Sequence, residues 1–412
     1  MNRKENVFGW NAAAAVLQSG HTVLLLMFAA HVGGAEDAGI LTIACAVANL
    51  LLVAGKYGVR QFQVSDIACK YRRETYVRAR LITLGAGAAA LVCVLMLRTW
   101  SGVYSERKAL TMFFFCVVRM VDAMEDAFHG ELQKRGELAL ASKLIVGRYL
   151  LYLTIFTAVY GKSKRLLLAA GAGAAASLCA AAALNFWAAK SCCNARGEKQ
   201  NAAAVWLLLR ECLPLGIMSV LSAYLSNAPK YIIDSRLSDS EQAKFNYVFM
   251  PVFAFCLLGM FLFQPMIVPY AKMQKNGERK MFRRVRLRQT FLLEGLTAAA
   301  LVLAKPVGIP VLSAVFGADL KGYETHLLIL VLGGGFFAVI QYYVMLLTVM
   351  RASKWVLAGF CAASALSALF GDAVVRRGGL LGISVFFAVL AGALGLYLRI
   401  VCAVKSGREE YT

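Results

Sequence analysis

Charged side chains recur inside one apolar stretch in the first third of the chain. Arg119, Asp122 and Asp126 fall within about an 80° arc at 100° per helical residue, as does His129, and Glu125 lies at the edge of that arc. Arg119 and Asp122 are spaced i, i+3, so they can pair on one helix. Ionisable groups in an apolar environment are costly unless they pair or contact a polar cavity. The stretch is therefore a candidate site for binding an anion or exchanging a cation.

Two other apolar stretches carry buried cations. Arg148 lies at a depth comparable to that of Glu125, and Lys230 has Asp234 one helical turn on. Two interpretations remain open. In the first, the pairs Arg119–Asp122 and Arg148–Glu125 neutralise each other and join helices. In the second, the cations line a wet cavity and hold an anionic head group such as a pyrophosphate, while the carboxylates bind or exchange protons or cations.

Lys56 and Arg60 lie at the end of another apolar stretch, next to further basic residues. Long basic side chains at this position commonly anchor a helix at the membrane surface. A basic cluster there can also attract an anionic lipid head group. Both interpretations of these two residues are kept.

The elements that must position these residues are membrane helices. The chain has 412 residues, of which 60% are hydrophobic and 16% charged, and its mean hydropathy is +0.64. Twelve helices of about 20 residues would take about 240 residues and leave only short connections. The spans are predicted near 8–33, 38–58, 81–98, 109–129, 141–160, 166–189, 212–235, 243–270, 290–311, 324–350, 355–374 and 380–404. A soluble enzyme is excluded, because no connection can form a soluble domain.

Charge distribution predicts the orientation of the spans. The net charge of +21 comes from basic residues that lie between apolar runs, without a nucleic-acid module, so a nucleic-acid partner is excluded. With the N-terminus inside, the inner loops collect more than twice as many Lys and Arg residues as the outer ones, which places both termini in the cytoplasm. No P-loop occurs, and the four His are scattered, so neither ATPase activity nor a metal site is expected.

The spans form two sets of six. The longest basic inner loop follows the second span of each set. This pattern predicts an N-terminal six-helix lobe at 1–189, a cytoplasmic linker at 190–211 and a C-terminal six-helix lobe at 212–412, with a cavity between repeats as in transporters. Gly333-Gly334-Gly335 lies inside a span, where close helix packing is expected rather than a phosphate loop.

Several motifs in this order resemble the bacterial polysaccharide-unit flippases of the multidrug/oligosaccharidyl-lipid/polysaccharide exporter superfamily. They are Lys56-Tyr-Gly-Val-Arg-Gln-Phe-Gln-Val-Ser-Asp66, Gly130-Glu-Leu-Gln133-Lys-Arg-Gly-Glu, Asn227-Ala-Pro-Lys230-Tyr-Ile-Ile-Asp234 with Phe245-Asn-Tyr-Val after it, and Phe316-Gly-Ala-Asp-Leu. The resemblance implies an all-α polytopic membrane protein with about 12 transmembrane helices in two six-helix lobes around a central cavity that opens alternately to each side. The implied substrate is an isoprenoid-pyrophosphate-linked oligosaccharide, moved to the outer leaflet for surface polysaccharide assembly.

The expected protein is thus a flippase of the bacterial cytoplasmic membrane and not an enzyme. The expected substrate-binding residues are Lys230, Arg119, Arg148, Lys56, Arg60 and Asn227. The expected ion-coupling residues are Asp122, Glu125, Asp126 and Asp234, with H⁺ or Na⁺ as the coupling ion and no other cofactor. The expected partners are the lipid-linked oligosaccharide and membrane lipids, and a polysaccharide polymerase is a further candidate.

Three rival functions are weighed against this expectation. A multidrug/cation antiporter of the same superfamily would need a cavity dominated by acids, whereas cations here match or outnumber them. A membrane polysaccharide polymerase or glycosyltransferase would need a sizeable outer loop, and the outer loops here have about ten residues or fewer. A scaffold without transport would leave the intramembrane charges unexplained.

Overall fold

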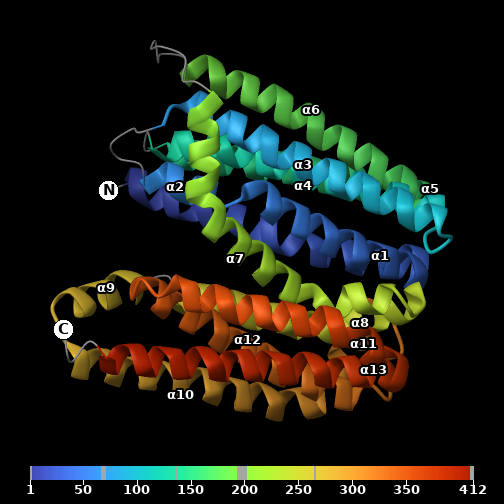
Figure 1. Cartoon of the computed structure of the whole chain (residues 1–412). Helices are drawn as coiled ribbons and strands as arrows, with labels where there is room; N and C mark the ends of the chain where they lie inside the picture. Colours follow the sequence, from blue (N-terminus) through green and yellow to red (C-terminus); the bar gives the residue numbers. More distant parts are fainter. Residues whose placement is uncertain (1, 66–70, 135–136, 193–201, 264–265, 409–412) are drawn as a thin grey trace. The chain divides into compact units, whose positions relative to one another are not determined.

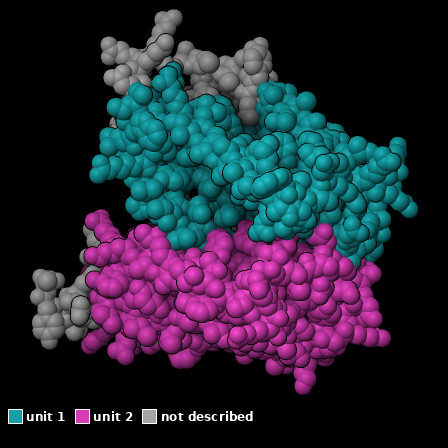
Figure 2. Space-filling view, turned by 45° about the vertical axis from the view of Figure 1, so that its right-hand side comes forward, with its two compact units in different colours: residues 1–223 teal, residues 224–412 magenta. Residues whose placement is uncertain are grey.

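The computed structural model describes residues 2–65, 71–134, 137–192, 202–263 and 266–408, and these form helices joined by short turns (Figure 1). The chain folds into two compact units, Met1–Ala223 and Tyr224–Thr412, coloured separately in Figure 2. The division falls inside one helix. Of the predicted linker, residues 202–211 belong to that helix, and 193–201 lie outside the described residues.

The first unit contains six helices and most of a seventh. These are α1 (Asn2–Lys56), α2 (Val59–Ser65), α3 (Arg73–Trp100), α4 (Glu106–Lys134), α5 (Leu138–Ser163), α6 (Leu166–Cys192) and α7 (Ala202–Asp234), whose last residues enter the second unit. The second unit continues with α8 (Asp239–Phe263), α9 (Ile267–Lys275), α10 (Arg279–Leu303), a π-helical turn η2 (Ala304–Gly308), α11 (Ile309–Phe316), α12 (Glu324–Val349) and α13 (Ser353–Arg408).

Two of these helices are pairs of membrane helices joined at a glycine. Gly34 in α1 has φ 74° and Gly379 in α13 has φ 54°, a left-handed conformation that costs glycine little and interrupts an α-helix. Eight stretches of the described residues are long and apolar enough to cross a membrane, and two of them contain these breaks. With α4 and α8 added, the chain has about twelve membrane-length helices in two lobes, as predicted.

Several predicted boundaries are wrong, and α7 begins at Ala202 rather than 212 and α10 at Arg279 rather than 290. The third span was expected to begin at 81, but α3 begins at Arg73, so Arg80 lies in a helix and not in a loop. A single span was expected over 243–270, but α8 ends at Phe263 and α9 is a separate helix. Pro269 lies in the first turn of α9, where a missing backbone N–H breaks no helical hydrogen bond.

Each unit packs around one central helix. In the first unit α4 packs against α1, α2, α3, α5 and α6. In the second unit α12 packs against α8, α10 and α13. Gly333, Gly334 and Gly335 allow this approach, since an added Cβ would lie 2.9 Å from Phe387, 3.1 Å from Val252 and 2.3 Å from Thr297, respectively. The expected role of these glycines in helix packing is confirmed.

Candidate functional site

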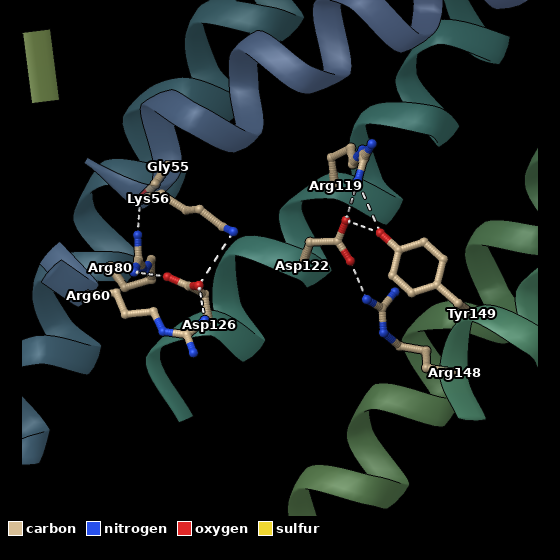
Figure 3. A network of polar contacts seen from close by, with 9 residues as sticks. All are labelled: Gly55, Lys56, Arg60, Arg80, Arg119, Asp122, Asp126, Arg148 and Tyr149. Carbon is tan, nitrogen blue, oxygen red and sulfur yellow. Dashed lines mark hydrogen bonds and ion pairs between the residues drawn. The ribbon is translucent and has the colours of Figure 1, made fainter. Parts of the chain in front are cut away.

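The candidate site of the first unit lies along α4, whose side chains join two polar clusters (Figure 3). The Asp122 network comprises Arg119, Asp122, Glu125, Arg148, Tyr149 and Ser177. The Asp126 cluster comprises Lys56, Arg60, Arg80 and Asp126. Asp122 and Asp126 are one helical turn apart on α4, yet they contact different helices. Asp122 contacts α5, whereas Asp126 contacts α1, α2 and α3.

The Asp122 network ties α4 to α5 and α6. Arg119 Nη1 donates to Asp122 Oδ2 at 2.9 Å, and Tyr149 Oη donates to the same oxygen at 2.7 Å. Arg148 pairs with Asp122 Oδ1 through Nη2 and with Glu125 Oε2 through Nε at 2.8 Å. The remaining nitrogen of Arg148 donates to Ser177 Oγ on α6 at 2.7 Å.

The guanidinium of Arg148 is completely buried and has an acceptor for each of its three nitrogens. Such saturation is what a charge inside a membrane protein requires. Both ion pairs of the pairing interpretation, Arg119–Asp122 and Arg148–Glu125, are therefore present.

The Asp126 cluster has a different composition, because three cations meet one carboxylate. Lys56 Nζ lies 3.4 Å from Asp126 Oδ1, and Arg60 Nη1 lies 2.9 Å from it. Arg80 Nη2 contacts Oδ2 at 2.9 Å. Arg80 is fully buried, whereas the side chains of Lys56 and Arg60 are about a third exposed.

Local backbone structure places these cations. α1 ends at Lys56 because Tyr57 (φ 46°) and Gly58 (φ 70°) take left-handed conformations. A Cβ on residue 58 would lie 2.9 Å from that of Leu215, so the turn also needs a glycine for space. Arg80 Nη1 then donates to the carbonyl of Gly55 at 2.7 Å, a group that the end of the helix leaves without an intrahelical partner.

The formal charges of the two clusters differ. In the Asp122 network two arginines face two carboxylates, and these four charges sum to zero. In the Asp126 cluster three cations and one carboxylate sum to +2. Three buried polar atoms beside the Asp126 cluster also lack a hydrogen-bond partner in the described part of the chain: Arg80 Nε, Gln63 Oε1 and His129 Nε2. A neutral network of paired charges stabilises a fold, whereas an excess of positive charge suits an anion, and of the three atoms Arg80 Nε is a donor for it.

A third polar group ties the other end of α4. Asp37, on the part of α1 after the Gly34 break, is buried and pairs with Arg107 at the start of α4. Tyr160 Oη on α5 donates to Asp37 Oδ2 at 2.6 Å. All four buried carboxylates described in the first unit (Asp37, Asp122, Glu125 and Asp126) thus contact at least one arginine.

The remaining predicted residues lie on the part of α7 that belongs to the second unit. Asn227, Lys230 and Asp234 are all buried and share one face of α7. The Lys230 ammonium lies 4.5 Å from the ring centroid of Phe253 and 5.3 Å from that of Phe249, within the range of cation–π attraction. The carbonyl of Lys230 accepts a hydrogen bond from Gln242 Nε2 at 3.2 Å.

Sequence reasoning named most of these first-unit residues but missed Arg80, Tyr149 and Ser177. Arg80 was assigned to a loop, although its spacing from Tyr76 is helical and could have extended the span. Tyr149 directly follows Arg148, but adjacent helical residues ordinarily point in different directions. Ser177 lies in an alanine-rich helix and gives no sequence signal.

Comparisons with known proteins identify the fold. No family model matches the chain, and no curated protein matches it. A mutant of the Vibrio cholerae MATE transporter VcmN is 14% identical over 97% of this chain and 96% of its own, with a TM-score of 0.64. An inward-facing MATE family transporter of the MOP superfamily is 14% identical over 96% and 94%, with a TM-score of 0.66.

A MOP superfamily transporter from Pyrococcus furiosus is likewise 14% identical over 98% of this chain and 96% of its own, with a TM-score of 0.59. These likenesses extend over nearly the full length of every chain compared. The chain therefore has the fold of the MATE transporters of the MOP superfamily.

Proposed function

We propose that the protein is a flippase that moves isoprenoid-pyrophosphate-linked oligosaccharides from the inner to the outer leaflet of a bacterial cytoplasmic membrane by alternating access. The observation that carries the proposal is the Asp126 cluster, where three cations converge on one carboxylate. A pyrophosphate is a polyanion, and it can form charge-assisted hydrogen bonds with several cations at once. The fold supports transport because solved MATE transporters are known in inward-facing and outward-facing conformations.

In this proposal the expected binding residues have different roles. Lys56 and Arg60 are partly exposed and contact the head group directly. Arg80 is buried and holds Asp126 in place, with its Nε as a further donor. Arg119 and Arg148 are assigned to helix–helix attachment, because Asp122 and Glu125 already neutralise them. Lys230, with Asn227 beside it, supplies a second cation in the other unit.

A multidrug/cation antiporter is the second candidate, because two of the similar structures are described as a multidrug resistance MATE family transporter. Such a function needs a carboxylate that is open to a cation. Asp122, Glu125 and Asp126, three of the expected ion-coupling residues, are each held by arginine, which favours an anionic cargo instead. The Pyrococcus furiosus transporter is described as having a binding pocket of reverse polarity that suggests a different function. The same fold is thus compatible with a cargo of the opposite charge.

The test is the leaflet distribution of isoprenoid-linked oligosaccharides, read with a glycosidase or lectin that acts only from outside. We expect complete units to accumulate at the inner face of cells that lack the protein. In cells with Lys56→Gln, outward movement should fall by about tenfold or more, since a charge-assisted contact contributes about 1.5–3 kcal/mol. Arg60 and Arg80 still hold Asp126 in this variant, so the protein should remain folded.

Arg78→Gln is the matched control, because it also removes one positive charge, two residues from Arg80, but from an exposed position. It should leave transport unchanged. If complete units reach the outer face equally with and without the protein, the proposed substrate is wrong. Drug efflux measured in the same strains then tests the antiporter.

Lys230 gives an independent prediction for the second unit. Lys230→Ala should abolish transport at an unchanged level of protein in the membrane, because it removes the charge of a buried cation that packs on two phenylalanine rings. The exposed Lys272→Ala serves as the control. Full transport by Lys230→Ala would remove Lys230 from the site.

A further inference from the structure

A second basic site lies wholly within the second unit, where α9, the start of α10 and the end of α13 meet. These helices enclose a cavity of about 610 Å³, a size typical of ligand sites. Its described lining includes four cations, Arg279, Lys280, Arg283 and Arg286, all on α10. No acid belongs to that described lining.

The cations of this pocket come from one helix in a helical pattern. Arg279, Arg283 and Arg286 are spaced i, i+4, i+7 and so share one face of α10, with Lys280 at its edge. In the described part of the chain, Lys280, Arg283 and Arg286 form no ion pair with a carboxylate, in contrast to the arginines along α4.

Arg286 is the most informative residue, because it is only 8% exposed and its side chain contacts neutral groups. Its Nη1 donates to Ser406 Oγ at 3.1 Å and lies 3.5 Å from Cys402 Sγ, both on α13. A buried guanidinium ordinarily pairs with a carboxylate, as Arg80 and Arg148 do here. The other side-chain nitrogens of Arg286 donate to no atom of the described part of the chain, which leaves donors available at the wall of the cavity.

The walls of the pocket are held in position by aromatic side chains. Tyr270 on α9 shares a hydrogen bond of 2.6 Å with Tyr342 on α12, and its ring packs edge-on against Phe282 at 5.2 Å. Tyr342 also donates to the carbonyl of Arg286 at 3.4 Å. These contacts hold the helices around the cavity in place. A ligand that binds there therefore does not have to order those helices.

We propose that this pocket binds the phosphate group of an anionic phospholipid. Arg279 begins a stretch of membrane-spanning length, so the pocket lies near the membrane surface. Basic pockets between membrane helices at this level suit anionic head groups. Leu287 and Phe291 are exposed about one and two turns beyond Arg283 on α10, where they can contact acyl chains that a soluble phosphate compound lacks. The proposal concerns a site apart from the Asp126 cluster and does not depend on the transported substrate.

The experiment uses the full-length protein in detergent, titrated with phosphatidylglycerol or with phosphatidylcholine, and reads retained lipid by native mass spectrometry together with Tm. We expect phosphatidylglycerol to be retained and to raise Tm, and phosphatidylcholine to do neither. The pocket variant Lys280→Gln/Arg283→Gln should weaken phosphatidylglycerol binding at least about tenfold. Both residues are exposed and unpaired with described acids, so the variant should fold.

The matched control is Arg284→Gln/Arg288→Gln, which removes two exposed cations from the same helix but from outside the pocket lining. It should change binding by less than about threefold. An equal loss of phosphatidylglycerol binding in both variants would show that the lipid responds only to general surface charge, and the proposed site would be wrong. If inorganic phosphate alone raises Tm and displaces phosphatidylglycerol, the ligand is a soluble phosphate compound and the lipid assignment is wrong.

Discussion

A buried arginine stabilises a membrane protein only where its charge is balanced, and the residues along α4 show two solutions. Around Asp122 the charges cancel and the donors are used, so these residues hold helices together. Around Asp126 the cations are in excess, and two of them are partly exposed. At the residue scale, the balance of charges distinguishes a network that joins helices from a proposed binding site. The mere presence of a charge in a span does not make that distinction.

This distinction predicts the effect of removing a carboxylate from the neutral network. Asp122→Asn leaves Arg119 and Arg148 with Glu125 as their only described carboxylate, and it should lower the free energy of unfolding by about 3–5 kcal/mol. Denaturation of the purified protein measures this loss. Asp122→Asn/Arg148→Gln should lose less than the sum of the two single changes, because the residues act as a pair.

Glu36→Gln is the control for that measurement. Glu36 is 72% exposed and lies 3.9 Å from Arg107, so its removal should cost less than about 1 kcal/mol. An equal effect of Asp122→Asn and Glu36→Gln would show that the buried network does not stabilise the fold.

The sequence alone predicts part of this residue-scale picture. Spacing on one helix predicted the pair Arg119–Asp122, and similar depth predicted Arg148–Glu125. It did not predict that Lys56, Arg60 and Arg80 would meet at Asp126, because they come from three different helices. Whether these residues meet depends on how the three helices pack against one another. The hydrophobic periodicity of a sequence carries no information about that packing.

At the scale of elements, the helices follow from apolar runs of membrane length, and the breaks at Gly34 and Gly379 fall in the predicted gaps 33–38 and 374–380. The errors occurred where charge and helix coincide. α3 extends about two turns before its apolar run, since Arg80 is buried by ion pairing rather than by hydrophobicity. A hydropathy profile does not detect a charged residue that is buried in this way.

Close packing of α12 gives a prediction at this scale. Gly335→Val should lower the free energy of unfolding by about 1–3 kcal/mol or more, because a side chain there meets Thr297 on α10 at 2.3 Å. Thermal denaturation of the purified protein measures the loss. Gly295→Ala on α10, where an added Cβ meets no atom within 4 Å, should be neutral or slightly stabilising. Equal Tm values for both variants would contradict the packing role.

At the scale of the whole molecule, the basic loops predict an orientation that cysteine labelling can measure. Asn276 follows α9 and Lys321 follows α11, and both are exposed. In a background with all eleven native cysteines replaced, Lys321→Cys should react with an impermeant thiol reagent in intact cells. Asn276→Cys should react only after the cells are opened. The reverse labelling pattern would show that the chain has the opposite orientation, with its termini outside.

The polarity of α4 also constrains how the protein is made. The eight apolar stretches of the described residues do not include this helix, which carries charged residues at the centre of the first unit. Emerging alone from the ribosome into the translocon, it would enter lipid poorly, because each unpaired charge resists insertion. Its partners on α1, α2 and α3 are already synthesised, but Arg148 on α5 is not. We therefore expect insertion of α4 to await α5, so that the two helices enter the bilayer as a hairpin in which Arg148 already pairs with Asp122 and Glu125.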